Sequence, residues 1–165
     1  WWSKDGKKNQ EGNYRSGQQH GTWVNYNEKG RKIEESQWKN GELFGKTTLW
    51  DKNGNKTILK SFKEDEKDGL WIWWHPNGKK VKEGNFKLGE KNGKWTYYHA
   101  NGKKKRLENY KLGKKNGKLI VWFDNGQKER ARLRAFCHLL WSIPSAYGKR
   151  GCGSTVRWGC LPFSG

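Results

Sequence analysis

Glycine and aromatic residues return every 24 positions along this chain. Several series in one register indicate tandem repeats, each a supersecondary unit that must stack on its neighbours. We assign a partial unit at 1–11 and five units over 12–131. The glycine series are Gly21, Gly45, Gly69, Gly93, Gly117 and Gly30, Gly54, Gly78, Gly102, Gly126. The aromatic series are Tyr14, Trp38, Phe62, Phe86, Tyr110 and Trp2, Tyr26, Trp50, Trp74, Tyr98, Trp122, with a looser one at Trp23, Thr47, Trp71, Trp95, Leu119.

Each unit is predicted to contain two strands and two turns. In the fourth unit, residues 93–98 form the first strand, 99–102 a turn, 103–111 the return strand and 112–117 a second turn. Asn-Gly recurs at 53–54, 77–78, 101–102 and 125–126. This dipeptide favours a hairpin with a type I′ turn, because both residues tolerate positive φ. Helix is disfavoured by the frequent glycine and by the lack of an apolar stripe with a 3.6-residue period.

Alternation along the strands predicts apolar side chains on both faces of the sheet. Trp71 and Trp73 share one face, and Leu70, Ile72 and Trp74 share the other. Only 32% of the chain is hydrophobic, yet 12 residues are Trp, so any core must consist mainly of rings. The predicted fold is therefore all-β: tandem hairpins in an elongated, single antiparallel sheet, stabilised by stacking of neighbours.

The repeat resembles the MORN repeat, and most closely the variant found in bacterial YwqK-type antitoxin proteins. That pattern is matched by Phe86, Gly89, Gly93, Trp95, Tyr98, Gly102 and Lys103. The preceding unit has Phe62, Gly69, Trp71, Trp74, Gly78 and Lys79, with Asp65 at the first glycine. The second unit has Thr47 in place of Trp; the last has Leu119 there and Gln127 after its glycine. The resemblance covers about 1–130 and implies a hairpin array that serves as a non-catalytic binding platform.

Two series of cations follow the same period. One contains Lys8, Lys32, Lys56, Lys80, Lys104 and Lys128; the other contains Arg15, Lys39, Lys63, Lys87 and Lys111. We call them the first and second basic ladders. Two strands per unit place equivalent cations about 10 Å apart. The ladders are our candidate partner-binding residues, and the net charge of +19 favours an anionic partner.

The sequence leaves several explanations of the ladders open. The lysines could simply protect strand edges and keep the sheet soluble, partly paired with Glu35, Glu83 and Glu129. If the ladders bind a partner, a protein is the leading candidate, and the resemblance implies that this protein is a toxin. An anionic lipid surface is the alternative, and a polyanion or nucleic acid the third reading.

Signs of catalysis are missing from the repeats. His75 and His99 occupy the same turn position, where other units have Asn27, Asp51 and Phe123. This pattern indicates a tolerant turn position, not a base or ligand pair. No nucleophile–base arrangement, phosphate-binding loop or zinc motif is readable. We therefore expect no enzyme activity, no cofactor and no small-molecule substrate.

The register ends after Arg130. Residues 131–165 contain no Asp or Glu, and all three Cys of the chain. We interpret this tail as a frameshifted or truncated product that is poorly ordered; a capping segment is the alternative. A metal site formed by Cys137, His138, Cys152 and Cys160 is disfavoured, because the spacing matches no known pattern. The chain begins at Trp1 without a Met, so we expect that its start is not a native translation start, and no apolar run is long enough to span a membrane.

Overall fold

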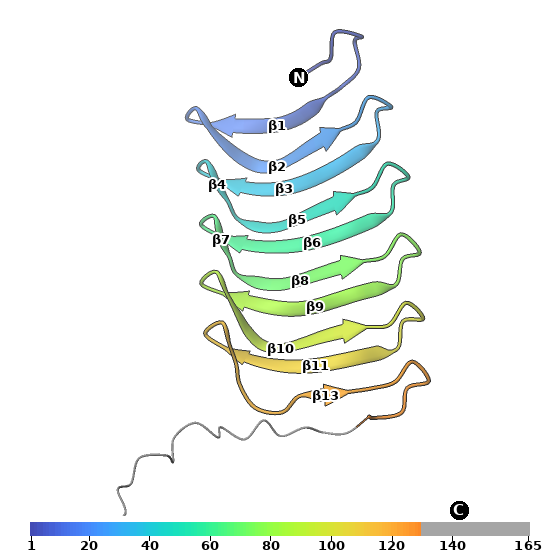
Figure 1. Cartoon of the computed structure of the whole chain (residues 1–165). Coiled ribbons are helices and arrows are strands. Elements are labelled where there is room, and N and C mark those ends of the chain that lie inside the picture. The colour runs from blue at the N-terminus through green and yellow to red at the C-terminus, as the bar shows by residue number, and fades with distance from the viewer. Residues whose placement is uncertain (130–165) are drawn as a thin grey trace, which may run out of the picture. The chain divides into compact units, whose positions relative to one another are not determined.

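A computed structural model of the chain describes residues 1–129. The predicted tail at 131–165 lies outside the described residues. The repeats form one antiparallel sheet of 13 strands, in which the long strands follow one another in sequence order and the short strands β4 and β7 pair with β3 and β6 (Figure 1). The predicted all-β array of tandem hairpins in a single sheet is confirmed.

The strands alternate between long ones and ones interrupted by a bend. They are β1 (Gln10–Arg15), β2 (Gln18–Tyr26), β3 (Lys32–Lys39), β4 (Glu42–Leu43), β5 (Gly45–Trp50), β6 (Lys56–Lys63), β7 (Glu66–Lys67), β8 (Gly69–Trp74), β9 (Lys80–Lys87), β10 (Glu90–Tyr98), β11 (Lys104–Lys111), β12 (Lys114–Lys115) and β13 (Ile120–Val121). The two-residue strands β4, β7 and β12 pair with β3, β6 and β11.

The turn chemistry differs from the prediction at both ends of the hairpins. In the turn of the second unit only Gly54 has positive φ (90°), and its N–H donates to Asp51 O at 3.0 Å. This is a three-residue loop, a type I turn followed by a left-handed glycine, so the predicted type I′ turn at Asn-Gly is wrong. Asn tolerates a left-handed φ but does not require one, and the extra residue lets the turn close without it.

Two-residue turns occupy the opposite edge of the sheet, where the prediction placed a six-residue turn. Leu88 and Gly89 both have positive φ (50° and 75°) between the paired residues Lys87 and Glu90. The same arrangement recurs at 16–17, 40–41, 64–65 and 112–113. The predicted turn at 112–117 is therefore too long: it ends after Gly113, and Lys114–Lys115 already form β12.

The strand after each two-residue turn bends at a glycine of the first glycine series. In β10, Asn92 pairs with Asn85 and Trp95 with Gly84, so the register slips between them. Gly93 lies in this slip with φ of 71°. The same bend separates β4 from β5 and β7 from β8. It lets one chain segment pair first within its own hairpin and then with both neighbouring strands.

Alternation assigns every strand residue to one of two faces, as predicted. We name them the Trp95 face and the Tyr98 face after residues of β10. The Trp95 face carries the series of Tyr14 and of Trp23, and a nearly continuous set of ring contacts joins Phe62, Trp71, Phe86, Trp95 and Tyr110 at 5.1–6.1 Å between centroids. Such pairs contribute about 0.5–1.5 kcal/mol each beyond burial.

The core consists of residues from both faces of the single layer. Trp23, Trp71, Trp95 and Tyr110 are buried on one face, and Val24 and Ile72 on the other. Trp95 lies flat across β9, and its indole Nε1 donates to Asn85 O at 3.1 Å. Trp23 and Trp71 donate in the same way to Asn13 O and Ser61 O. The indole N–H groups are thus satisfied by the sheet itself, as burial of Trp requires.

Candidate partner-binding surfaces

The first basic ladder lies on the Tyr98 face, directly across from aromatic rings. Lys80 is the register partner of Trp74, and Lys104 that of Tyr98. Lys32 and Lys56 pair in the same way with Tyr26 and Trp50, and Lys128 forms a bridge with Trp122. The structure therefore brings this predicted series into one row. Its side chains lie beside rings; Lys32 Nζ is 5.5 Å from the centroid of the Trp50 ring.

Carboxylates neutralise part of the first ladder. Lys8, Lys32 and Lys80 form ion pairs with Glu11, Glu35 and Glu83 at 2.6, 2.5 and 2.7 Å. The residues three positions after Lys56 and Lys104 are Leu59 and Leu107. Among the described residues these two lysines make no ion pair. The ladder thus contains both paired and unpaired cations.

Two of these glutamates also accept a hydrogen bond from a tyrosine of the next hairpin. Tyr26 donates to Glu11, and Tyr98 donates to Glu83. Burial and this hydrogen bond raise the pKa of Tyr98 to about 12. Burial alone would raise the pKa of Glu83, but the hydrogen bonds from Lys80 and Tyr98 outweigh it and hold that pKa below its ordinary value. Each Lys–Glu–Tyr set links two hairpins.

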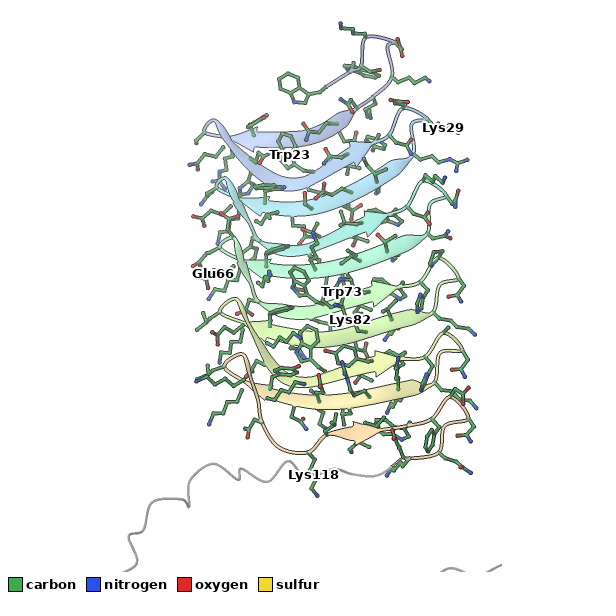
Figure 2. The ribbon with its side chains drawn as sticks, viewed as in Figure 1. Trp23, Lys29, Glu66, Trp73, Lys82 and Lys118 are labelled. Carbon is green, nitrogen blue, oxygen red and sulfur yellow. The ribbon has the colours of Figure 1, made fainter. Side chains whose placement is uncertain are left out.

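The second basic ladder lies at the opposite ends of the same strands. Arg15, Lys39, Lys63, Lys87 and Lys111 each end a strand at a two-residue turn, and all are exposed. Their partners across the turn are Gln18, Glu42, Glu66, Glu90 and Lys114. In Figure 2, Glu66 marks this edge of the sheet and Lys29 marks the edge with the three-residue turns.

Both predicted ladders face the same side of the sheet. Within β3, Glu35, Gln37 and Lys39 share a face by alternation, and the ion pair with Glu35 places Lys32 there too. The two rows are seven positions apart along each strand, or roughly 23 Å. The Tyr98 face therefore carries two rows of cations, with the rings and the glutamates of the first ladder between them.

A further group of cations on the Trp95 face was missed by the sequence analysis. The Nζ atoms of Lys82 and Lys91 lie 4.2 and 4.4 Å from the centroids of Trp73 and Trp95. Arg106 lies 4.2 Å from the Tyr97 centroid, and Lys67 lies 5.5 and 5.3 Å from Trp71 and Phe86. Figure 2 shows Trp73 and Lys82 next to each other on neighbouring strands. These cations lack the full 24-residue recurrence, so a search for periodic series could not find them; strand alternation could have placed them beside the rings.

His75 and His99 occupy equivalent three-residue turns of neighbouring hairpins. His99 Nε2 lies 2.9 Å from Trp122 O, a contact between neighbouring turns. Within residues 1–129 there is no cluster of three or more His, Cys, Asp or Glu side chains that could hold a metal ion. The same residues contain no helix that could cross a lipid bilayer.

These features define a class: an open β-hairpin repeat protein with two accessible faces instead of a cleft. The family described as "MORN repeat variant" matches residues 67–88 and 91–112, two adjacent repeats. A solved structure, "Crystal structure of GtfA/B complex bound to UDP and GlcNAc", is similar over 68% of this chain and 22% of that chain, at 14% identity and a TM-score of 0.30. No curated protein matches.

Proposed function

We propose that the chain is a non-catalytic scaffold that binds the acidic surface of a protein partner through its Tyr98 face. The observation that carries this proposal is the placement of both basic ladders on one face, at opposite ends of the same strands. MORN repeats are modules often present in binding proteins. Two rows of cations about 23 Å apart match the width of a small protein surface rather than that of a single peptide.

Catalysis is not part of this proposal. Enzyme sites usually lie in clefts that exclude water and bring several polar groups together. A single-layer sheet with two open faces supports contact over an area instead. A toxin neutralised by contact with this face is the particular partner that the resemblance to antitoxin proteins favours.

An anionic lipid surface is the second candidate. Lys56 and Lys104 support it, because their neighbours Leu59 and Leu107 leave their charge unneutralised on the ladder. Each lysine near an anionic bilayer contributes about 1 kcal/mol. A nucleic acid ranks third, because the rings of the Tyr98 face are half-buried beside lysines and offer little free surface for stacking on bases.

The test compares three probes: poly-L-glutamate, vesicles with and without phosphatidylserine, and a single-stranded oligonucleotide. The variant replaces the second ladder (R15Q, K39Q, K63Q, K87Q, K111Q). Its control removes five cations from the edge with the three-residue turns and from the Trp95 face (K29Q, K52Q, K60Q, K79Q, K103Q). We expect poly-glutamate to bind, and the ladder variant to bind at least about tenfold more weakly than the control, since each lost contact costs a few tenths to 1 kcal/mol. Equal weakening in both variants would show that only net charge matters.

The other probes decide between the alternatives. Binding only to vesicles that contain phosphatidylserine would replace the protein partner with a membrane. Binding only to the oligonucleotide, with a steep decrease between about 50 and 200 mM salt, would favour the nucleic-acid reading.

A further inference from the structure

Four cations on the Trp95 face form a compact group that we call the cationic strip: Lys67, Lys82, Lys91 and Arg106. Lys67 and Lys91 are one repeat apart, and so are Lys82 and Arg106. Each is held over one or two aromatic rings, with 4.2–5.5 Å between the charged group and the nearest contacted centroids. The rings fix the positions of the charged groups before any ligand arrives, which lowers the entropy lost on binding.

The fold does not require cations at these positions. Gln19 and Leu43 occupy the place of Lys67 and Lys91 in earlier units, and Glu34 and Ile58 occupy the place of Lys82 and Arg106. Those units form the same hairpins with the same pairing. The strip is therefore a local addition to one half of the sheet and not a structural element of the repeat.

The strip is only partly neutralised. The carboxylate nearest to it on this face is that of Glu108, which is 4% exposed. It is already occupied by Lys115 at 2.8 Å and by the Tyr110 hydroxyl at 2.8 Å, with Arg106 Nε at 3.7 Å. The strand carboxylates Glu66, Glu83 and Glu90 belong to the Tyr98 face by their register partners. Among the described residues Lys67, Lys82 and Lys91 thus make no ion pair, and Arg106 shares one buried carboxylate with Lys115.

The spacing of the strip selects a ligand shape. One repeat advances two strands, or about 10 Å along the sheet. A polyproline II segment has three residues per turn and rises about 9.3 Å per turn, so every third side chain points the same way. Carboxylates at every third position would then meet Lys67 and Lys91, or Lys82 and Arg106, in succession. The half-buried rings of Trp73 and Tyr97 lie in the row of Lys82 and Arg106 as their register partners, and they hold these two cations in position.

Nucleic acid fits the strip less well. Stacking needs an accessible ring face, but Lys82 lies over Trp73 and Arg106 over Tyr97, while Trp95 is only 1% exposed. We propose that the cationic strip binds an extended acidic segment of a protein, in polyproline II conformation, with Asp or Glu at every third position. The strip lies on the face opposite to the basic ladders, so this site does not depend on the function proposed above.

The experiment uses the full chain and two labelled peptides of equal composition. One peptide has Glu at every third position among Pro and Ala; the other has the same Glu residues consecutively. Binding is measured by fluorescence anisotropy at fixed salt. The strip variant is K67Q, K82Q, K91Q, R106Q, and its control removes four cations outside the strip and the ladders: K46Q, K52Q, K94Q, K118Q. Gln is natural at this position in the first unit, as Gln19, and thermal melts show whether each variant is folded.

We expect the spaced peptide to bind at least about fivefold more tightly than the consecutive one, and the strip variant to lose about tenfold or more of that affinity. The control should stay within about threefold of the parent chain. The quintuple variant of the second ladder should bind the spaced peptide normally. Equal affinity for both peptides, or equal loss in the strip and control variants, overturns the proposal, as does tighter binding of an oligonucleotide that the strip variant abolishes.

Discussion

At the scale of single residues, the closest packing in the sheet is between Gly84 and Trp95. A Cβ atom at Gly84 would lie 2.3 Å from the indole ring, and one at Gly12 would lie 2.2 Å from the ring of Trp23. Glycine is required here because the tryptophan lies flat on the backbone of the neighbouring strand. Where the second unit has Thr47 instead of Trp, the residue at the equivalent of Gly84 is Ser36. Trp71 has Lys60 at this position, so the glycine and the ring are coupled at Trp23 and Trp95 but not in every unit.

Substitution of Gly84 by Ala should destabilise the protein by about 2–3 kcal/mol, since the methyl group overpacks a buried site. Urea unfolding followed by Trp fluorescence measures the change. In a Trp95→Thr background the same G84A substitution should cost less than about 1 kcal/mol, because the ring that it displaces is absent. Equal costs in both backgrounds would mean that the glycine is needed for its backbone and not for the ring.

The Tyr98 hydroxyl makes the free energy of unfolding depend on pH in the alkaline range. Its pKa is raised to about 12 in the folded chain by burial and by the hydrogen bond to Glu83, so the folded state holds the phenolic proton more tightly than the unfolded state does. This contribution is complete below about pH 10 and is lost as the pH rises towards 12. The difference in unfolding free energy between the parent and Tyr98→Phe should therefore shrink between about pH 9 and pH 11.5. The comparison with Y98F isolates the contribution of this hydroxyl, and a difference in unfolding free energy that does not change with pH would contradict the prediction.

The periodic sequence predicts which residues repeat, but not which of them meet. The Tyr14 and Trp23 series were recognisable as separate sets, and alternation placed Trp71 and Trp73 on one face correctly. The pairing of Tyr98 with Glu83 was not predictable, because it joins residues 15 positions apart in different hairpins. It depends on the register between strands, which the bulges after each three-residue turn determine.

At the scale of elements, the turns show the limit of short sequence motifs. Asn-Gly predicted a hairpin turn in the right place but of the wrong type, because the loop there has one more residue than a type I′ turn. The true two-residue turns contain Leu88-Gly89 and Leu112-Gly113, and leucine is not a residue that the left-handed region favours. In these turns the strand register imposes positive φ on Leu88 (50°) and Leu112 (48°), so local preference could not identify them.

Leu88→Asn should stabilise the protein by about 0.5–1 kcal/mol, since Asn tolerates the left-handed conformation that Leu88 is forced to adopt. The second unit offers the matched reverse change, because Asn40 has the same conformation (φ 52°). Asn40→Leu should destabilise by a similar amount. Thermal unfolding of both variants measures the effect. Leu88 is 68% exposed, so little packing is lost in L88N. A destabilised L88N would contradict this account of the turn.

At the scale of the whole molecule, stability comes from contacts between successive hairpins. The sheet has no crossover within residues 1–129, so each hairpin meets only its neighbours along the chain. In such an array, stability is close to a sum of the units and their interfaces. The sequence predicts this architecture because the architecture depends only on the 24-residue period. The cationic strip consists of residues that recur in only some of the units, so it could be recognised only after the two faces of the sheet had been assigned.

Deletion of one whole repeat tests this view. Removal of residues 44–67 takes out 24 residues and joins two segments in the same phase, so every side chain keeps its face and its neighbours. The shortened chain should fold, with a β-sheet spectrum in circular dichroism and a lower free energy of unfolding, since one interface is lost. Removal of 23 residues instead, 44–66, shifts the phase by one position and exchanges the Trp95 and Tyr98 faces beyond the junction. Rings would then face the wrong side of the sheet, and the cost of such a slip should prevent cooperative unfolding. If both deletions gave equally stable sheets, the fold would depend on turn propensity and general hydrophobicity, and not on the stacking of equivalent residues from one hairpin to the next.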